Sequence, residues 1–171
     1  MDRALIFHLD RCTSCGLCES ICSLTHTQTC DPERSRIRIA RIEPQGIYLQ
    51  MFCQQCEDAA CIAACPVSAI GRSQATGALE IDHELCTLCE ACMAACSFSG
   101  IGHDAVDQTI IACDLCGGEP NCVRFCETKA IEFLEQDSIV VQDKNESLQE
   151  FRELIKLLVP GESKLKELDP L

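Results

Sequence analysis

Short runs of alternating apolar and polar residues recur along this chain and predict short β-strands. They lie at Leu5–Leu9, at Ile37–Ile42, where isoleucines alternate roughly with basic residues, and at Ile47–Met51 and Ala78–Ile81. No apolar run reaches the ~20 residues that a membrane-spanning helix needs. The pattern therefore predicts a chain built from short strands, with no membrane span.

The C-terminal part adds a hairpin and one helix to this pattern. The run Ile131–Val141 predicts a closing hairpin. Ser147 and Glu150 form a capping-box pattern ahead of an apolar stripe with helical spacing, and Pro160-Gly161 provides a stop. We therefore expect an amphipathic helix over residues 148–159, and we favour its packing on the body of the protein over docking to another subunit.

Cysteines fill the segments between the predicted strands, and 17 of the 171 residues are cysteine. All but Cys30 fall into four groups, here called the first to fourth quartets: Cys12, Cys15, Cys18 and Cys22; Cys53, Cys56, Cys61 and Cys65; Cys86, Cys89, Cys92 and Cys96; Cys113, Cys116, Cys122 and Cys126. The first and third have the spacing C-x2-C-x2-C-x3-C, and the second and fourth lengthen only the middle gap. We expect only short helices between these cysteines.

This spacing is typical of [4Fe–4S] cubane clusters. Three thiolates in one tight loop can hold three iron corners, while backbone N–H groups of the loop turn toward the sulfurs. The fourth iron corner needs a distant cysteine, and in two-cluster ferredoxins the other quartet supplies it. The sequence therefore predicts four [4Fe–4S] clusters, with each quartet lending its last cysteine to a partner quartet. Cys30 is then a spare thiol.

Disulfides and zinc are the alternatives to iron–sulfur clusters. A disulfide scaffold needs an oxidising compartment, whereas the N-terminus Met1–Leu5 lacks the basic and apolar regions of a signal peptide. Zinc sites usually show two C-x2-C pairs separated by a longer loop, not three cysteines within seven residues. We therefore expect a cytoplasmic protein with reduced thiols, and favour iron–sulfur clusters.

Composition and charge limit the remaining possibilities. Aromatic residues make up 4% of the chain and tryptophan is absent, so clusters should form much of the core and the iron-free chain should be largely unfolded. The formal net charge is −13, from 14 basic and 27 acidic residues, which argues against nucleic acid as a partner. The acidity fits either plain solubility or docking to a basic partner surface.

The quartets are organised as an interrupted repeat, and the expected fold class is α+β with two ferredoxin-like units of the bacterial dicluster type. Residues 47–103, with the second and third quartets, form an inserted unit. Residues 1–46 and 104–141, with the first and fourth quartets, form a unit that is split in sequence. Residues 142–171 form the C-terminal helix and tail.

This pairing of quartets gives four expected ligand sets. They are cluster 1, Cys12, Cys15, Cys18 and Cys126; cluster 2, Cys22, Cys113, Cys116 and Cys122; cluster 3, Cys53, Cys56, Cys61 and Cys96; and cluster 4, Cys65, Cys86, Cys89 and Cys92.

The order and gaps of the quartets resemble those of the four-cluster ferredoxin-like subunits of molybdenum and tungsten oxidoreductases, hydrogenases and carbon monoxide dehydrogenases. The resemblance covers residues 3–141, and its most characteristic segments are Cys53–Pro66 and Cys113–Cys122. It implies the same cluster pairing and a non-catalytic electron-transfer subunit in a hetero-oligomeric complex. The partners it implies are a catalytic oxidoreductase subunit and a second redox protein.

Two segments refine the resemblance. Asp31–Ile39 and Cys113–Gly118 look most like the small subunits of tungsten enzymes in the aldehyde:ferredoxin oxidoreductase superfamily, which includes the ATP-independent benzoyl-CoA reductase. Related subunits serve hydrogenase, formate dehydrogenase and carbon monoxide dehydrogenase complexes, and the cysteine chemistry does not separate them. A free polyferredoxin and a structural metal-binding protein also remain open.

Other candidate chemistry is sparse, and no catalytic residue is expected. Only Cys65 is followed by the proline that ferredoxin motifs often carry; Cys22, Cys96 and Cys126 precede Ser or Glu. His26 could donate a hydrogen bond toward a cluster or simply lie on the surface. The chain has no Gly-rich phosphate-binding motif, so flavin or nicotinamide chemistry is expected on another chain.

Overall fold

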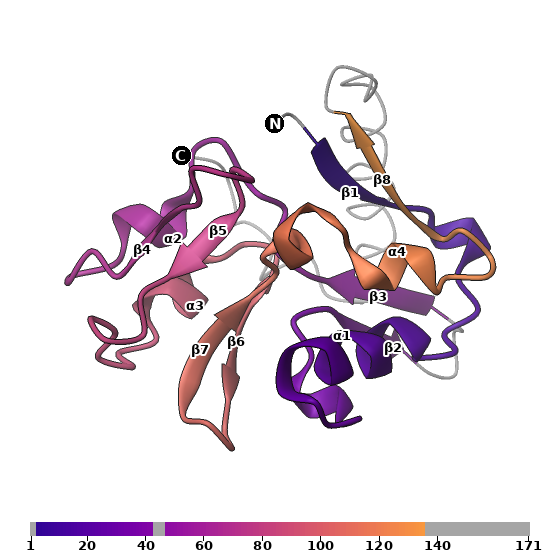
Figure 1. Ribbon diagram of the computed structural model, residues 1–171, viewed down its shortest axis with the longest axis horizontal. Helices are drawn as coiled ribbons and strands as arrows, with labels where there is room; N and C mark the ends of the chain where they lie inside the picture. The colour runs from indigo at the N-terminus through magenta and orange to yellow at the C-terminus, as the bar shows by residue number, and fades with distance from the viewer. Residues whose placement is uncertain (1–2, 43–46, 136–171) are drawn as a thin grey trace, which may run out of the picture. The chain divides into compact units, whose positions relative to one another are not determined.

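The computed structural model describes residues 3–42 and 47–135, which form small antiparallel sheets linked by short helices (Figure 1). None of the helices in these two ranges is long and apolar enough to cross a membrane. The predicted helix over residues 148–159 and the second strand of the predicted hairpin lie outside the described residues.

Eight described strands pair two by two. The pairs are β1 (Arg3–Phe7) with β8 (Ile131–Glu135), β2 (Arg38–Ile42) with β3 (Ile47–Met51), β4 (Ile70–Arg72) with β5 (Leu79–Ile81), and β6 (Ile101–Asp104) with β7 (Thr109–Ala112). In the β1–β8 sheet Leu5 lies opposite Phe133, so the two ends of the described chain lie side by side (Figure 1). This pairing brings the segments that carry the first and fourth quartets together.

The strands agree with the alternation in the sequence where that alternation is long enough. β3 lies where it was predicted, and β1, β2 and β5 lie within two residues of their predictions. β4, β6 and β7 were not predicted, because each has three or four residues and none shows a clear alternation.

The helices are α1 (Leu17–Thr27), α2 (Ala60–Ala63), α3 (Ala91–Ala95) and α4 (Asn121–Arg124), and the 3-10 turns are η1 (Leu9–Arg11), η2 (Pro32–Arg34) and η3 (Leu115–Gly118). The expectation of short helices is right for α2 to α4 and wrong for α1, which has 11 residues. α1 continues past Cys22 until Gln28 adopts a left-handed conformation that ends it. In the second quartet, Pro66 follows the last cysteine directly and the helix is short.

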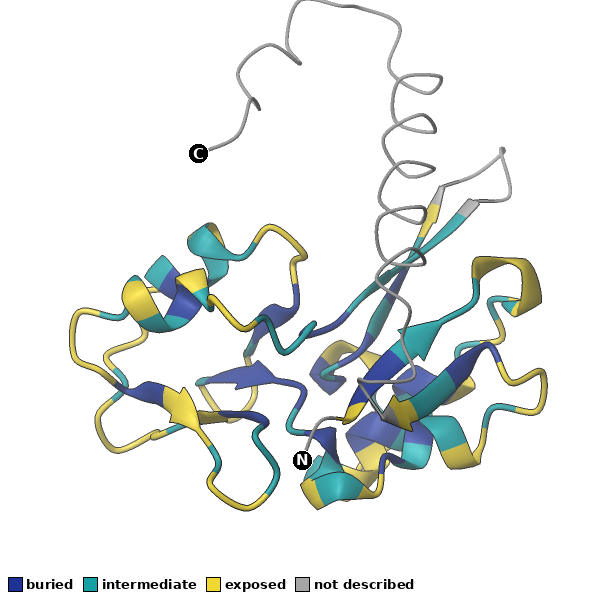
Figure 2. Ribbon diagram, turned by 90° about the horizontal axis from the view of Figure 1, so that it is seen from above, coloured by how far each residue is buried: buried dark blue, intermediate teal, exposed yellow. Residues whose placement is uncertain are grey.

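The core consists of aliphatic side chains and cysteines. Figure 2 shows the buried residues along the ribbon in dark blue. Ile37, Ile110 and Ile131 are almost completely buried, and Phe52 is the one fully buried aromatic residue among those described. Seven cysteines are also buried: Cys18, Cys22, Cys53, Cys61, Cys92, Cys113 and Cys122. Thiols therefore make up a substantial part of an otherwise aliphatic interior, and the expectation that clusters form much of the core stays a prediction.

A buried ion pair fixes the β6–β7 hairpin to the segment after α1. Asp31 caps η2 by accepting a hydrogen bond from the backbone N–H of Glu33. From η2, Arg34 Nε donates to Asp104 Oδ2 at 2.8 Å, and both side chains are buried. Desolvation raises the pKa of Asp104, but the hydrogen bond from Arg34 and the backbone donors of the hairpin turn give a net lowering. The pair therefore holds two distant segments together.

Candidate metal centres

The four Cys-x2-Cys loops share one backbone conformation. The residue just before the second cysteine has a positive φ in every loop, although none of the four is glycine: Ser14 (56°), Gln55 (51°), Leu88 (56°) and Leu115 (58°). Left-handed residues in such turns point successive backbone N–H groups toward one side, which creates a site for anionic groups. Non-glycine residues persist in this conformation only where the surroundings require it, as at ligand sites.

A second shared feature follows the last cysteine of three quartets. The third residue after it has a positive φ, and the fourth donates its backbone N–H to the cysteine sulfur. The donors are Ala69 to Cys65 (3.2 Å), Gly100 to Cys96 (3.3 Å) and Ala130 to Cys126 (3.3 Å).

These backbone donors favour thiolates. Desolvation raises the pKa of Cys65 and of Cys126, yet hydrogen bonds from backbone N–H groups, and from the Thr128 side chain at Cys126, lower both pKa values overall. Because the thiolate is the form that binds iron, both residues are already suited to ligation in the folded chain.

The first quartet departs from this pattern. Cys22 lies inside α1, and the fourth residue after it is His26, whose backbone N–H belongs to the helix. Instead, the backbone N–H of Arg36 donates to Cys22 Sγ at 3.4 Å. The sulfur thus receives its donor from a segment 14 residues away.

A cysteine of the third quartet, Cys96, lies near the thiols of the second quartet. Burial raises the pKa of Cys53 to about 11; the backbone N–H of Gln55 opposes this, and the neighbouring thiols of Cys61, Cys56 and Cys96 add to it. Cys96 also raises the pKa of Cys61. These four sulfurs therefore lie close together.

A cysteine of the first quartet, Cys22, lies near the thiols of the fourth quartet. Burial raises the pKa of Cys122 to about 12, and the thiols of Cys22, Cys116 and Cys18 raise it further. Burial also raises the pKa values of Cys113 and Cys116, and Cys22 contributes to both shifts. The structure thus brings Cys22 to the first three cysteines of the fourth quartet.

A cavity brings together the expected ligands of cluster 4. Its lining includes Cys65 of the second quartet with Cys86, Cys89 and Cys92 of the third. Cys92 has a raised pKa, caused first by burial and further by the thiols of Cys86 and Cys61.

The first quartet forms the remaining thiol group. Burial raises the pKa of Cys18 to about 12, with further contributions from Glu19, Cys15 and Cys12.

Buried polar groups support the first quartet loop. Glu19 is buried and accepts hydrogen bonds from the backbone N–H of Ile39 at 2.9 Å and from Arg41 Nη2 at 3.0 Å. Arg41 Nε in turn donates to Ser14 Oγ at 2.8 Å, and the N–H of Ser14 donates to Cys12 Sγ at 3.4 Å. The loop conformation therefore depends on the adjacent strand β2.

Gln55 links the second and fourth quartets. Its Nε2 donates to the backbone carbonyl of Cys113 at 2.7 Å, and its Oε1 accepts from the N–H of Leu79 at 2.8 Å. The thiols of Cys18 and Cys122 are also neighbours, which links the first and fourth quartets. The thiols of Cys61 and Cys92 link the second and third quartets in the same way.

The quartet cysteines differ in their exposure. Cys15 of the first quartet and Cys89 of the third are exposed. Cys30, outside the quartets, is exposed as well, and no disulfide joins any of the described cysteines.

The donor set fits [4Fe–4S] clusters. Several buried thiols are packed against one another, and ionising them without a nearby cation would be unfavourable, as their raised pKa values show. Iron supplies that cation, and the backbone N–H groups supply donors to the sulfurs. Arg36 Nε is also buried and has no hydrogen-bond partner among the described residues.

Several supporting residues were not singled out from the sequence, namely Gln55, Arg36, Gly100 and Asp114. For Gly100 a signal did exist, because the fourth residue after the last cysteine is small in three quartets. At Gly100 a Cβ atom would lie 2.5 Å from the carbonyl oxygen of Phe52 and 2.6 Å from the N of Cys53. The glycine therefore allows the segment after Cys96 to pass against the start of the second quartet.

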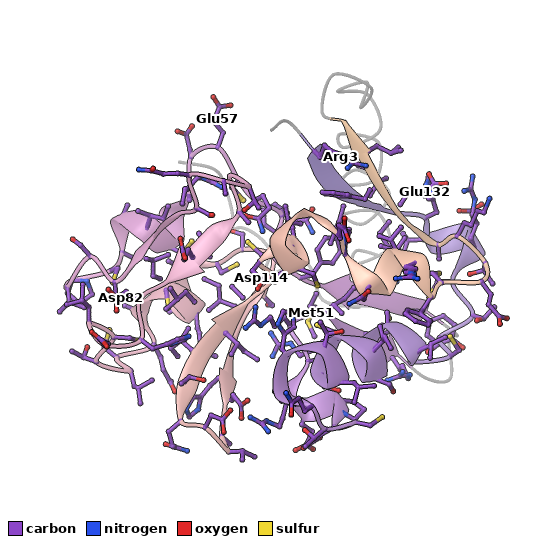
Figure 3. The ribbon with its side chains drawn as sticks, in the orientation of Figure 1. Arg3, Met51, Glu57, Asp82, Asp114 and Glu132 are labelled. Atoms are coloured by element: carbon purple, nitrogen blue, oxygen red, sulfur yellow. The ribbon has the colours of Figure 1, made fainter. Side chains whose placement is uncertain are left out.

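Charge is unevenly distributed among the described residues. Between residues 47 and 103, the only basic residue is Arg72, while six acidic residues are exposed and form no ion pair: Glu57, Asp58, Glu80, Asp82, Glu84 and Glu90. Figure 3 shows Glu57 and Asp82 pointing outward. Asp82 and Glu90 flank the loop that carries the exposed Cys89.

Comparison with known proteins gives consistent matches. The family described as the 4Fe-4S dicluster domain matches residues 44–136. The polyferredoxin-like subunit of aliphatic sulfonate oxidoreductase from Pyrococcus furiosus is 42% identical over 117 residues, covering 68% of this chain and 67% of that protein. The β subunit of NADH-dependent phenylglyoxylate dehydrogenase from Aromatoleum evansii is 31% identical over 76% of this chain, which spans 30% of that protein.

Solved structures were compared as well. A chain in the active-site complex BamBC of benzoyl-coenzyme A reductase with benzoyl-CoA matches with a TM-score of 0.48 and 22% identity, covering 88% of this chain and 89% of that chain.

Proposed function

Because this chain belongs to the 4Fe-4S dicluster domain family, we propose that it is a non-catalytic subunit that carries four [4Fe–4S] clusters. When bound, such clusters supply one-electron transfer at potentials set by ligand burial, charge and hydrogen bonds to sulfur. The protein contributes the thiolates, the backbone donors and a buried setting. The observation that carries the proposal is the gathering of thiols from different quartets into ligand groups.

The ligand sets are those expected from the sequence. The thiol neighbours described above support Cys22, Cys113, Cys116 and Cys122 as one set, and Cys53, Cys56, Cys61 and Cys96 as another. The shared cavity supports Cys65, Cys86, Cys89 and Cys92. Cys12, Cys15, Cys18 and Cys126 complete the assignment. The β1–β8 pairing supports the union of residues 1–46 and 104–141 in one ferredoxin-like unit, with residues 47–103 as the other.

The neighbours of each set suggest a linear order of clusters 1, 2, 3 and 4. Cys18 and Cys122 connect the first two sets, and Cys61 and Cys92 connect the last two. Gln55 joins the two middle sets through the carbonyl of Cys113. The exposed cysteines Cys15 and Cys89 then belong to clusters 1 and 4, at the two ends of this order. An electron-transfer chain with one docking face at each end requires exposed ligands there.

The partners follow from these two ends. We propose that the cluster 4 end, with its unpaired acidic residues, docks to a partner with a basic surface, because complementary charge speeds association and orients the encounter. The other end would serve the second partner. One of the two is the catalytic subunit of a hetero-oligomeric complex, working in the cytoplasm, where cysteines stay reduced.

The catalytic partner is proposed to be a tungsten enzyme of the aldehyde oxidoreductase or benzoyl-CoA reductase type. The segments Asp31–Ile39 and Cys113–Gly118 carry the resemblance to subunits of those enzymes. They also place Arg36 and Asp114 beside the same ligand group. A relative that is a polyferredoxin-like subunit of an oxidoreductase supports the general role.

Anaerobic purification of the intact complex from its native source tests this proposal. We expect a large catalytic chain to co-purify, with tungsten and with about sixteen iron atoms for each small chain beyond those of the partner. A nickel enzyme as the partner would contradict the tungsten assignment and leave electron transfer standing. A chain that purifies alone, with zinc and without iron, would refute the whole proposal.

A further inference from the structure

Three polar side chains, His26, Asp114 and Arg36, lie around Cys116, an expected ligand of cluster 2. His26 Nε2 lies 3.7 Å from Cys116 Sγ and 3.5 Å from Asp114 Oδ1. Asp114 also pairs with Arg36 and accepts the backbone N–H of Cys116 at 2.9 Å. Within residues 3–42 and 47–135, the only other side-chain hydrogen-bonding group at a quartet sulfur is the hydroxyl of Thr128, at 3.6 Å from Cys126 Sγ.

The position of His26 in the repeat explains why its side chain can take this role. In the other quartets, the fourth residue after the last cysteine is small and gives its backbone N–H to that cysteine. In the first quartet this position falls within α1, so its backbone N–H is not available and its side chain is large. His26 instead reaches across to Cys116, a ligand of the same proposed cluster that receives Cys22.

We infer that His26 is a positioning residue that raises the reduction potential of cluster 2 by donating its Nε2–H to the thiolate of Cys116. This inference rests on the proposed function. Reduction adds one negative charge to the cluster and its thiolates, so a donor at sulfur stabilises the reduced state more than the oxidised state.

Asp114 and Arg36 act on the same cluster with opposite signs. The carboxylate of Asp114 places a negative charge beside Cys116 and disfavours reduction, whereas the guanidinium of Arg36 offsets that charge. Asp114 lies directly after Cys113, between β7 and η3 (Figure 3), so it is close to two ligands at once. The network therefore predicts shifts of opposite direction when its members are changed singly.

The test is an EPR-monitored redox titration of the full chain with its clusters, for the wild type and for His26→Leu. The transition of cluster 2 is identified as the one lost in Cys116→Ser. At fixed solution potential we expect His26→Leu to lower the reduced-to-oxidised ratio of that cluster about tenfold, which is about 59 mV for a one-electron couple. Asp114→Asn should shift the same transition upward.

Two further variants separate hydrogen bonding from a structural role. His26→Gln keeps an N–H donor and should restore most of the shift with full iron content. His103→Leu is the matched control, because His103 is similarly half-buried and its Nε2 has no partner among the described residues, so no potential should move.

Specific results would overturn the inference. One is a His26→Leu protein whose four reduction potentials all match those of the wild type. Another is a uniform shift of all four potentials. A third is a His26→Gln protein whose cluster 2 potential is as low as that of His26→Leu. If His26→Leu loses its iron, the potential of His26→Gln decides the question. A wild-type chain without four reversible transitions would refute the proposed function itself, a result distinct from any variant effect.

Discussion

Gly100 provides a sharp test of how the second and third quartets are held together. Adding a methyl group in Gly100→Ala would place Cβ 2.5 Å from Phe52 O, whereas ordinary contacts begin at 3.4 Å. The obstacle is backbone, so the two segments must separate by roughly 0.9 Å. Because Gly100 also donates to Cys96 Sγ at 3.3 Å, this movement shifts a ligand of cluster 3 away from Cys53.

The expected cost of Gly100→Ala follows from overpacking. Such changes destabilise proteins by about 1–3 kcal/mol, and 1–2 kcal/mol alone changes the folded-to-unfolded ratio about 5–30-fold. The matched control is Gly71→Ala, since a Cβ atom at Gly71 meets nothing within 4 Å.

The assay is anaerobic denaturation followed by the visible absorbance of the clusters, together with iron content. We expect Gly100→Ala to lose its clusters at lower denaturant concentration and to bind less iron, while Gly71→Ala behaves as the wild type. Equal denaturation midpoints and equal iron content for Gly100→Ala and the wild type would refute the close approach at Phe52–Cys53.

Three further predictions follow from the same structure. Arg34→Ala leaves the buried carboxylate of Asp104 without its Arg34 partner, so the melting temperature should fall. The control Arg124→Ala should not lower the melting temperature comparably. An unchanged melting temperature for Arg34→Ala would contradict the role of the pair. Cys30→Ser should keep the full iron content and all EPR signals, because Cys30 is exposed and outside the quartets; loss of one cluster's iron would show that it is a ligand. Removing iron with a chelator under anaerobic reducing conditions should abolish the cooperative unfolding transition in circular dichroism, because buried thiols form part of the interior. A sharp transition retained by the iron-free protein would contradict a core that depends on clusters.

The sequence predicts the longer strands better than the short ones. Cysteine spacing also predicts ligand groups, because a cubane needs three close thiolates and one distant one, and those groups stay a prediction. Short strands such as β4, with three residues, carry too little alternation to be recognised. The expectation of a short helix is also wrong for α1, which continues past Cys22 to Thr27.

Contacts between distant segments could not be predicted from local pattern. Arg34 reaches Asp104 across 70 positions, and Gln55 reaches the carbonyl of Cys113 across 58. Both contacts depend on how the strand pairs fold back on one another. For His26 the sequence leaves open a hydrogen bond toward a cluster or a surface position, and it does not indicate which thiol; in the structure His26 Nε2 lies 3.7 Å from Cys116 Sγ.

The most direct test of the central claim is an anaerobic redox titration of the purified, reconstituted chain with iron analysis. The account predicts about sixteen iron atoms per chain and four one-electron reductions that generate reduced-cluster EPR signals. Stoichiometric zinc, or iron that does not undergo reversible reduction, would contradict an electron-transfer function.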